Sequence, residues 1–306
     1  MKRVLVTGAS GFIGQHLLPH LTARGFEVHA VHSQTAADKE AHAVSHCADL
    51  FAALRVKALF KELKPSHLVH LAWIATPGIY QNSLENLRWV QASIEIARQF
   101  VANGGTRIVG IGSCAEYDWS GGLCSEAATP TIPSSLYGVC KLSVGSLLAA
   151  MAKETATSVA WARLFFPYGP REHSQRLIPS VIQSLLRQEA GRCSLGTQIR
   201  DYIFVDDVAG AIAALLESDV SGPINVASGV GVSVRDIVTK IATIMDRPEL
   251  IQLGALKQSV PEANEIVGDV ARLVSELRWT PQYNLERGLK TTIEWWREHY
   301  DGNATV

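Results

Sequence analysis

The stretch that decides the fold runs Arg3-Val-Leu-Val-Thr-Gly-Ala-Ser-Gly-Phe-Ile-Gly14. Its beginning is a short apolar run typical of a buried strand, and a helical pattern follows from about Phe12 to Arg24. Gly8, Gly11 and Gly14 allow a tight turn and a close approach of the backbone to a phosphate. The helix start adds free N–H groups and the positive end of its dipole. The stretch therefore predicts a pyrophosphate-binding loop, although the spacing is G-x-x-G-x-x-G instead of G-x-G-x-x-G.

Strand-like and helix-length segments alternate after this loop. We expect strands at 27–31, 43–47, 67–72, 106–112 and 158–165, and helices at 51–63, 84–101 and 137–153. Such alternation predicts a parallel sheet covered by helices on both faces. After Pro167 the loops lengthen, and we expect a strand at 200–204 and helices at 178–188, 207–216, 234–245, 271–277 and 285–299.

The predicted fold class is α/β, a doubly wound parallel-sheet Rossmann fold with a smaller mixed α/β C-terminal substrate lobe. Residues 1–166 would form the dinucleotide-binding domain, with a strand and a helix returning to it from about 199–227. Residues 167–306 would form mainly the substrate-binding lobe.

Composition narrows the class of protein. Of 306 residues, 47% are hydrophobic and 19% charged, which is enough apolar material for a buried core. The net charge is -1 and no basic stripe is present, so we expect neither nucleic acid nor a membrane surface as partner. We find no signal peptide and no apolar stretch near the roughly 20 residues of a membrane helix. Five cysteines without metal-ligand spacing predict reduced thiols, no metal site and a cytoplasmic location.

The end of the second strand bears on the choice of dinucleotide. An acidic residue there accepts hydrogen bonds from the adenosine ribose of NAD. Here the strand ends in His32 and Ser33, which could both donate to a 2′-phosphate, and no carboxylate would repel one. The cofactor is therefore NADP or NAD, with a slight lean to NADP. Asp49, after the third strand, has two interpretations: a partner for the adenine amino group, or the N-cap of the next helix.

Tyr137 and Lys141 form a Tyr-x-x-x-Lys pair whose side chains share one helix face. A free tyrosine titrates near pH ~10 and is a poor acid at neutral pH. A nearby lysine cation stabilises the phenolate, so the pair can exchange a proton with a substrate oxygen. Ser113 follows the 106–112 strand, at the sheet edge where ligands bind, and could hydrogen bond that oxygen. We predict Ser113, Tyr137 and Lys141 as the catalytic residues.

Together these residues resemble the extended short-chain dehydrogenase/reductases of the NAD-dependent epimerase/dehydratase family, in the branch that acts on nucleotide sugars. Thr7–Gly14 looks like the cofactor loop of that family, and His70-Leu-Ala72 looks like its fourth-strand motif. Tyr168-Gly-Pro170 and Arg200–Asp207 match motifs of its substrate-binding half. The resemblance covers nearly the whole chain and implies a homodimer, formed through the helices at 84–101 and 137–153.

The resemblance also implies the remaining site residues. The cofactor-binding set is Gly8, Ser10, Gly11, Phe12, Ile13, Gly14, His32, Ser33, Asp49, Leu50, Leu71, Ala72, Trp73, Asn86, Tyr137, Lys141 and Phe165. The substrate-binding set is Ser113, Cys114, Phe166, Arg171 and Arg200. Arg200 would approach the diphosphate of the nucleotide sugar, or else form a structural salt bridge with Asp201 or Asp206. Trp73 and Tyr80 would cover the nicotinamide or the sugar, or pack locally.

Three reactions run on this scaffold: ketoreduction, epimerisation and 4,6-dehydration. Family dehydratases carry Asp-Glu directly after the catalytic hydroxyl residue, whereas this chain has Cys114-Ala115, which argues against a dehydratase. The run Ser113-Cys-Ala-Glu-Tyr117 resembles the Ser-x-x-Glu-Tyr pattern of nucleotide-sugar 4-ketoreductases. We therefore expect NAD(P)-dependent reduction of a 4-keto-6-deoxy sugar. The alternatives are an NAD-dependent C4-epimerase and, in another class, a non-catalytic dinucleotide-sensing protein.

Two positions depart from the family pattern. Phe166 stands where many relatives have a substrate-contacting asparagine. The stretch Pro261–Glu265 contains no cation, whereas the family often has an arginine for the diphosphate before Gly268. Cys114 has two interpretations, a substrate contact or a small buried residue that points away from the substrate. We favour the second, because adjacent residues of an extended chain face opposite ways.

Overall fold

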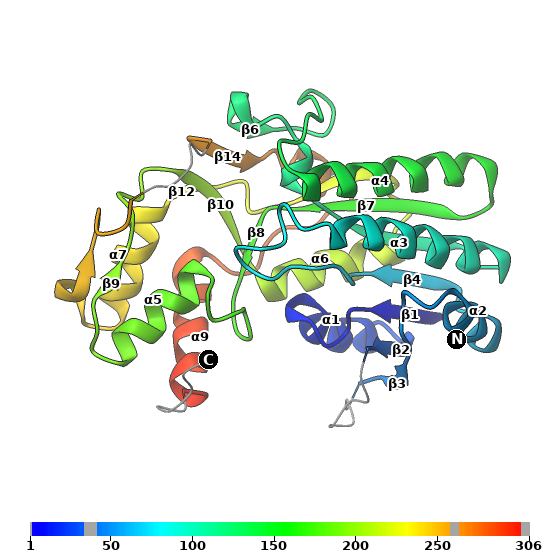
Figure 1. The fold of residues 1–306 in the computed structure, drawn as a ribbon, viewed down its shortest axis with the longest axis horizontal. Coiled ribbons are helices and arrows are strands. Elements are labelled where there is room, and N and C mark those ends of the chain that lie inside the picture. The colour runs from blue at the N-terminus through cyan, green and yellow to red at the C-terminus, as the bar shows by residue number, and fades with distance from the viewer. Residues whose placement is uncertain (1, 34–41, 258–262, 301–306) are drawn as a thin grey trace.

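The computed structural model describes residues 2–33, 42–257 and 263–300, and its main feature is a seven-stranded sheet (Figure 1). The strand order is β11-β7-β5-β4-β1-β2-β3, and all neighbouring strands are parallel. The strands are β1 (Arg3–Thr7), β2 (Glu27–His32), β3 (Val44–Cys47), β4 (His67–His70), β5 (Arg107–Ser113), β7 (Ser158–Leu164) and β11 (Gly222–Val226). The predicted α/β fold class is confirmed.

Helices cover both faces of this sheet because successive strand residues point to opposite faces. Val4 and Val6 of β1 share one core cluster with α1 and α6. Leu5, between them, belongs to a second cluster with α2, α3 and α4. The helices are α1 (Phe12–Ala23), α2 (Ala53–Leu63), α3 (Glu85–Ala102), α4 (Leu136–Glu154) and α6 (Val205–Glu217).

A smaller sheet forms the C-terminal lobe, at the opposite end of the molecule from β1, β2 and β3 (Figure 1). Its strands run in the order β12-β10-β14-β6, with β8 also paired to β10, and only β10 and β12 are antiparallel. Helices α5, α7 and α9 enclose the core of this lobe. The elements are β6 (Leu123–Cys124), β8 (Phe166–Tyr168), β10 (Ile199–Phe204), β12 (Gly231–Ser233), β14 (Glu265–Gly268), α5 (Leu177–Leu186), α7 (Val234–Ile244) and α9 (Leu285–Glu298).

Several short elements escaped the sequence prediction because two or three residues carry no readable alternation. They are β6, β8, β12, the pair β9 (Gly191–Arg192) and β13 (Ile251–Gln252), and the 3₁₀ turns η1 (Cys114–Glu116), η2 (Trp119–Gly121) and η3 (Pro248–Leu250). The predicted helix at 271–277 is the shorter α8 (Ala271–Ser275). The β6 strand matters most for the site, because it ties the segment after Ser113 to β14 of the C-terminal lobe.

Helix α4 corrects one expectation. Within the described residues it is the one helix long and apolar enough, by length and composition alone, to cross a membrane. The expectation that no stretch comes near that length is therefore wrong. Length and composition alone are weak evidence for a membrane span, and Val144 and Leu148 of α4 are buried against the sheet.

The site is positioned by the reversal of strand order at β1. The chain passes from β1 to β2 on one side, whereas β4 pairs with β1 on the other side. Ligands of open α/β sheets bind at such a point, beyond the carboxyl ends of the strands. The residues that follow β1, β4 and β5 therefore meet at one edge of the sheet.

Candidate active site

The loop after β1 is a tight, glycine-lined turn at the start of α1. Gly8 has φ +71°, and the Gly11 N–H donates to the Gly8 carbonyl over 3.0 Å. A Cβ on Gly8 would lie 2.7 Å from the Ala72 nitrogen, and one on Gly14 would collide with the backbone oxygens of Gly8 and Ala9. Helix α1 starts directly after this loop, and no side chain caps its first N–H groups. This cradle fits a pyrophosphate, so the predicted cofactor loop has the required geometry.

A neutral histidine fastens this loop to the neighbouring strand. His70 Nδ1 and Thr7 Oγ1 lie 2.7 Å apart, and His70 Nε2 lies 2.8 Å from Ser93 Oγ on α3. Burial lowers the pKa of His70 to about 3, with a further contribution from the Lys141 charge. His70 is therefore uncharged and joins β1, β4 and α3 at the carboxyl edge of the sheet.

Of the two donors predicted at the end of β2, only Ser33 is exposed. His32 is buried at the end of the strand and Ser33 is exposed beside it. The Asp49 carboxylate accepts a hydrogen bond from the Phe51 N–H over 2.9 Å. The alternative that Asp49 caps the next helix is wrong, because α2 begins at Ala53 and its N-cap residue, Ala52, has no capping side chain.

The segment after β4 contributes aromatic side chains to the site. The Trp73 indole N–H donates to Asn86 Oδ1 over 2.8 Å, and the Asn86 amide donates to the Tyr80 carbonyl over 2.6 Å. Trp73 lies under Lys141, with Nζ 4.0 Å from the ring centroid. Tyr80 packs edge-on against Tyr137 at 4.9 Å between centroids. Both aromatic residues therefore contact the predicted catalytic pair.

The structure brings Ser113, Tyr137 and Lys141 together. Lys141 Nζ donates to the Ile111 carbonyl over 2.8 Å and lies 5.9 Å from the Tyr137 ring centroid. Burial lowers the pKa of Lys141 to about 7, whereas the Glu116 charge raises it. Burial raises the pKa of Tyr137, and a hydrogen bond to the Ser113 side chain acts in the opposite direction. A phenol, a hydroxyl and an amine at one strand end form a proton-transfer site.

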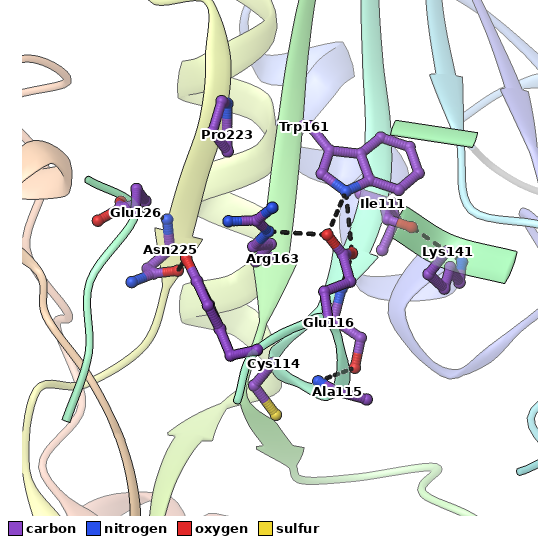
Figure 2. Close-up of polar contacts among 12 residues, drawn as sticks. Ile111, Cys114, Ala115, Glu116, Glu126, Lys141, Trp161, Arg163, Pro223 and Asn225 are labelled. Atoms are coloured by element: carbon purple, nitrogen blue, oxygen red, sulfur yellow. Dashed lines mark hydrogen bonds and ion pairs between the residues drawn. The ribbon is translucent and has the colours of Figure 1, made fainter. Parts of the chain in front are cut away.

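A buried charged cluster around Glu116, for which the sequence predicted no role, adjoins Ser113 (Figure 2). The Glu116 carboxylate is fully buried and accepts hydrogen bonds from the Arg163 Nε–H over 2.8 Å and the Trp161 indole N–H over 2.9 Å. The Arg163 guanidinium also covers the Tyr117 ring, whose hydroxyl donates to Asn225 Oδ1 over 2.8 Å. The only sequence signal was the charged Arg163 in an otherwise apolar strand, together with the Ser-x-x-Glu-Tyr pattern.

The predicted substrate residues occupy two places. Cys114 is buried in an apolar cluster with Phe165, and Phe166 packs against that cluster. Burial raises the pKa of the Cys114 thiol. Arg171 lies on the loop after β8, with φ +68°, and donates to Gln15 Oε1 of α1 over 2.6 Å.

Arg200 is buried on β10. Its guanidinium donates to the carbonyls of Ile199 and Ala263 over 2.8 and 2.9 Å, and it lies 5.7 Å from the Phe166 ring centroid. The alternative of a salt bridge to Asp201 or Asp206 is wrong. Asp201 accepts from the backbone amides of Ser228, Gly229 and Gly268, while Asp206 pairs with His20. The predicted cation-free stretch before Gly268 lies partly outside the described residues, at 261–262.

Comparison with known proteins agrees with this geometry. Residues 4–227 match the NAD dependent epimerase/dehydratase family. The chain belongs to this family. It is therefore an NAD-dependent enzyme of the short-chain dehydrogenase/reductase type, and the predicted resemblance is confirmed. In the described residues no group of three or more His, Cys, Asp or Glu could hold a metal ion.

Relatives in the family modify nucleotide sugars. The chain is 30% identical to a dTDP-4-dehydro-6-deoxy-D-allose reductase of Streptomyces bikiniensis, over 97% of both chains. It is 27% identical to a dTDP-L-rhamnose 4-epimerase of Burkholderia thailandensis, over 98% of this chain and 96% of the relative. The solved structure of MoeE5 with UDP-glucuronic acid and NAD is 31% identical, with a TM-score of 0.84 over 97% of this chain and all (100%) of MoeE5.

Proposed function

We propose that this enzyme reduces a nucleotide-activated 4-keto-6-deoxy sugar with NADPH or NADH. The observation that carries the proposal is the pair after Ser113, where family dehydratases have Asp-Glu. Ala115 cannot exchange a proton, and the Cys114 thiol is buried in an apolar cluster. Ser113, Tyr137 and Lys141, which are sufficient for ketoreduction, are brought together. The 30% identity to a 4-keto-sugar reductase supports the same reaction.

The chain's own residues would supply the proton and the orientation. A bound nicotinamide supplies the hydride that reduces the keto carbon. Tyr137 would donate a proton to the carbonyl oxygen, and the Ser113 hydroxyl would hold that oxygen beside it. The Lys141 cation would stabilise the phenolate that forms, and its bond to the Ile111 carbonyl fixes its position.

We infer a slight preference for NADP from the end of β2. No carboxylate of the described residues follows His32 on that strand, and the exposed Ser33 is available to a 2′-phosphate. A carboxylate at this place selects for NAD, through the ribose hydroxyl. We further propose a cytoplasmic enzyme, in keeping with its five free cysteines.

Dinucleotide release from the purified, denatured protein tests the reaction type. We expect little tightly held cofactor, tighter binding of NADPH than NADH, and consumption of NADPH with 4-keto nucleotide sugars. Loss of NADPH absorbance across a panel of such sugars measures the activity. If the protein instead carries near-stoichiometric NAD and interconverts C4 epimers with no net use of NADPH, it is an epimerase and the proposed reductase function is wrong.

We also propose that the enzyme works as a homodimer through α3 and α4. Both helices expose apolar side chains that a partner would cover: Leu87 is 53% and Ile94 40% exposed on α3, and Val139 is 45% and Leu147 49% exposed on α4. Sedimentation at micromolar concentration should give a dimer that L87E/L147E converts to a monomer. A wild-type monomer would exclude this interface.

A further inference from the structure

Glu116 is a buried carboxylate with an unusually complete set of donors (Figure 2). It accepts from the Ser113 backbone N–H over 2.9 Å, from the Trp161 indole over 2.9 and 3.1 Å, and from Arg163 Nε over 2.8 Å. Both members of the Glu116–Arg163 ion pair are nearly inaccessible, with 0% and 6% of their side chains exposed. In Figure 2 the carboxylate points toward Trp161 and Arg163, and Cys114 points the other way.

The bond to Ser113 is part of a reciprocal capping box. The Ser113 hydroxyl oxygen accepts from the Ala115 N–H over 3.1 Å, while Glu116 accepts from the Ser113 N–H. The backbone and the side chain of Ser113 are thus fixed by one turn. The hydroxyl proton remains available to a substrate oxygen or to Tyr137.

Glycines make the room for this cluster. A Cβ on Gly112 would lie 2.5 Å from Glu116 Oε1, and one on Gly110 would lie 2.6 Å from the Trp161 ring. A Cβ on Gly145 of α4 would lie 2.8 Å from the same indole. Strands β5 and β7 and helix α4 therefore all leave space around one buried charge.

Stability alone does not account for such an arrangement. Replacing a buried ion pair by well-packed apolar residues is often neutral or stabilising, because desolvation of the two charges offsets their attraction. A role in the reaction accounts for it, because Glu116 binds the backbone N–H of Ser113 at the end of β5, where the predicted catalytic groups meet.

We propose that Glu116 is a positioning residue for hydride-transfer chemistry, which fixes Ser113 through the turn and supports the Lys141 cation by its charge. This inference rests on the proposed function. The charged and titratable groups around Lys141 are Tyr137 on its own helix, His70 on β4 and Glu116 on η1, with the Trp73 ring beneath it. The Glu116 charge raises the pKa values of both Lys141 and Tyr137.

Two substitutions distinguish the positioning of Ser113 by Glu116 from the effect of the Glu116 charge on Lys141 and Tyr137. Glu116→Gln removes the charge, so the pKa values of Lys141 and Tyr137 should both fall. The alkaline limb of the kcat profile should then move to lower pH, by about one unit. Glu116→Asp keeps the charge but shortens the side chain, so kcat should fall on the order of 10–100-fold while the limb stays in place. KM should change little in either variant.

Glu126→Gln is the matched control. Glu126 also accepts a backbone N–H, that of Asn225, over 2.7 Å, but it lies beside β11 and not behind Ser113. We expect its pH profile to match the wild type. If Glu116→Gln and Glu116→Asp lose activity equally, and the alkaline limb of the kcat profile stays at the wild-type pH in both, Glu116 is only structural and the proposal is wrong.

Two further measurements keep the test decisive. If Glu116→Gln does not fold, Glu116→Gln/Arg163→Gln removes the whole ion pair, and the alkaline limb should still move to lower pH. Phenolate absorbance of each protein, minus that of its Tyr137→Phe counterpart, titrates Tyr137 without any substrate. A wild type inactive on 4-keto sugars would overturn the proposed function, whereas an unshifted Tyr137 titration in the Gln variants would overturn the role of Glu116.

Discussion

The predicted cofactor half and the predicted substrate half of this site are built by different means. On the cofactor side, backbone geometry sets the shape: the left-handed Gly8 and the crowded Gly14 leave no room for a Cβ, and the nearby His70 is neutral. On the substrate side, buried charged side chains set the shape. Arg200 donates to two carbonyls, and Asp201 accepts from three backbone amides.

This difference teaches where each half is vulnerable. A collision between a new Cβ and backbone atoms has no flexible partner that could move aside. A side-chain network can instead lose one member and rearrange in part. We therefore expect large effects from small changes in the cofactor loop, and graded effects on the substrate side.

The largest effect should fall where the two halves meet, at Tyr137. Tyr137→Phe removes the proton donor, so kcat should fall on the order of 10²–10⁴-fold. Affinity for the dinucleotide, measured by calorimetry, should stay near the wild-type value because the cofactor loop is untouched. Tyr283→Phe, in the C-terminal lobe, serves as the control. A Tyr137→Phe protein with full turnover would refute the assignment and revive the sensor alternative.

The next effect tests the rigidity of the cofactor half. Gly14→Ala places a Cβ against the backbone oxygens of Gly8 and Ala9, whereas Gly11→Ala meets only the Gly8 oxygen, at 3.2 Å. We expect dinucleotide affinity to fall at least about 100-fold in the first variant and about tenfold in the second. Fluorescence titration with NADPH measures both. Equal and small losses would mean that the loop is less rigid than this comparison requires.

A smaller effect is expected on the substrate side. Arg200→Met keeps an apolar side chain of similar length over Phe166 but removes the charge and the bonds to Ile199 and Ala263. If the guanidinium faces a diphosphate, KM for the nucleotide sugar should rise about tenfold with little change in kcat. The affinity for NADPH should not change. A drop in both affinities would show that Arg200 supports the whole fold and not the substrate half.

The same division explains what could be predicted from the sequence. The strand–loop–helix at 3–14 and the Tyr137/Lys141 pair depend on neighbours within one or two turns, so periodicity and spacing were sufficient. The contact of Glu116 with Trp161 and Arg163 depends instead on the register of β5 against β7, which sets Trp161 beside Gly110 and Arg163 beside Gly112. No local pattern specifies that register.

The substrate half was less predictable for the same reason. The salt-bridge alternative pairs Arg200 with Asp201 or Asp206. The structure uses Asp201 to bind the backbone amides of Ser228, which follows β11, and of Gly268, the last residue of β14. Its real partners are set by a sheet of short strands, and those strands are too brief to show a period-2 pattern.

The smallest effect concerns Glu172, a partly buried residue on the predicted substrate side. It lies on the loop after β8, and its Oε2 atom is buried without a hydrogen-bond partner among the described residues. Burial raises the pKa of Glu172 to about 8, although the Arg176 charge acts in the opposite direction. The folded protein therefore holds a proton that the unfolded chain releases near its ordinary pKa of 4.5.

The sign of the pH effect follows from that difference. Between about pH 4.5 and 8 the folded state binds more protons at Glu172 than the unfolded chain does, so the free energy of unfolding falls as pH rises through this window. Above about pH 8 the destabilisation is constant. Glu172→Gln removes this dependence, so the variant should melt at a higher temperature relative to wild type at pH 8 than at pH 5. Melting curves at both values measure the change, with the exposed Glu249→Gln as control. If the difference in melting temperature between variant and wild type is the same at both pH values, Glu172 is ionised in the folded protein. Its carboxylate would then be as well solvated as one on the surface.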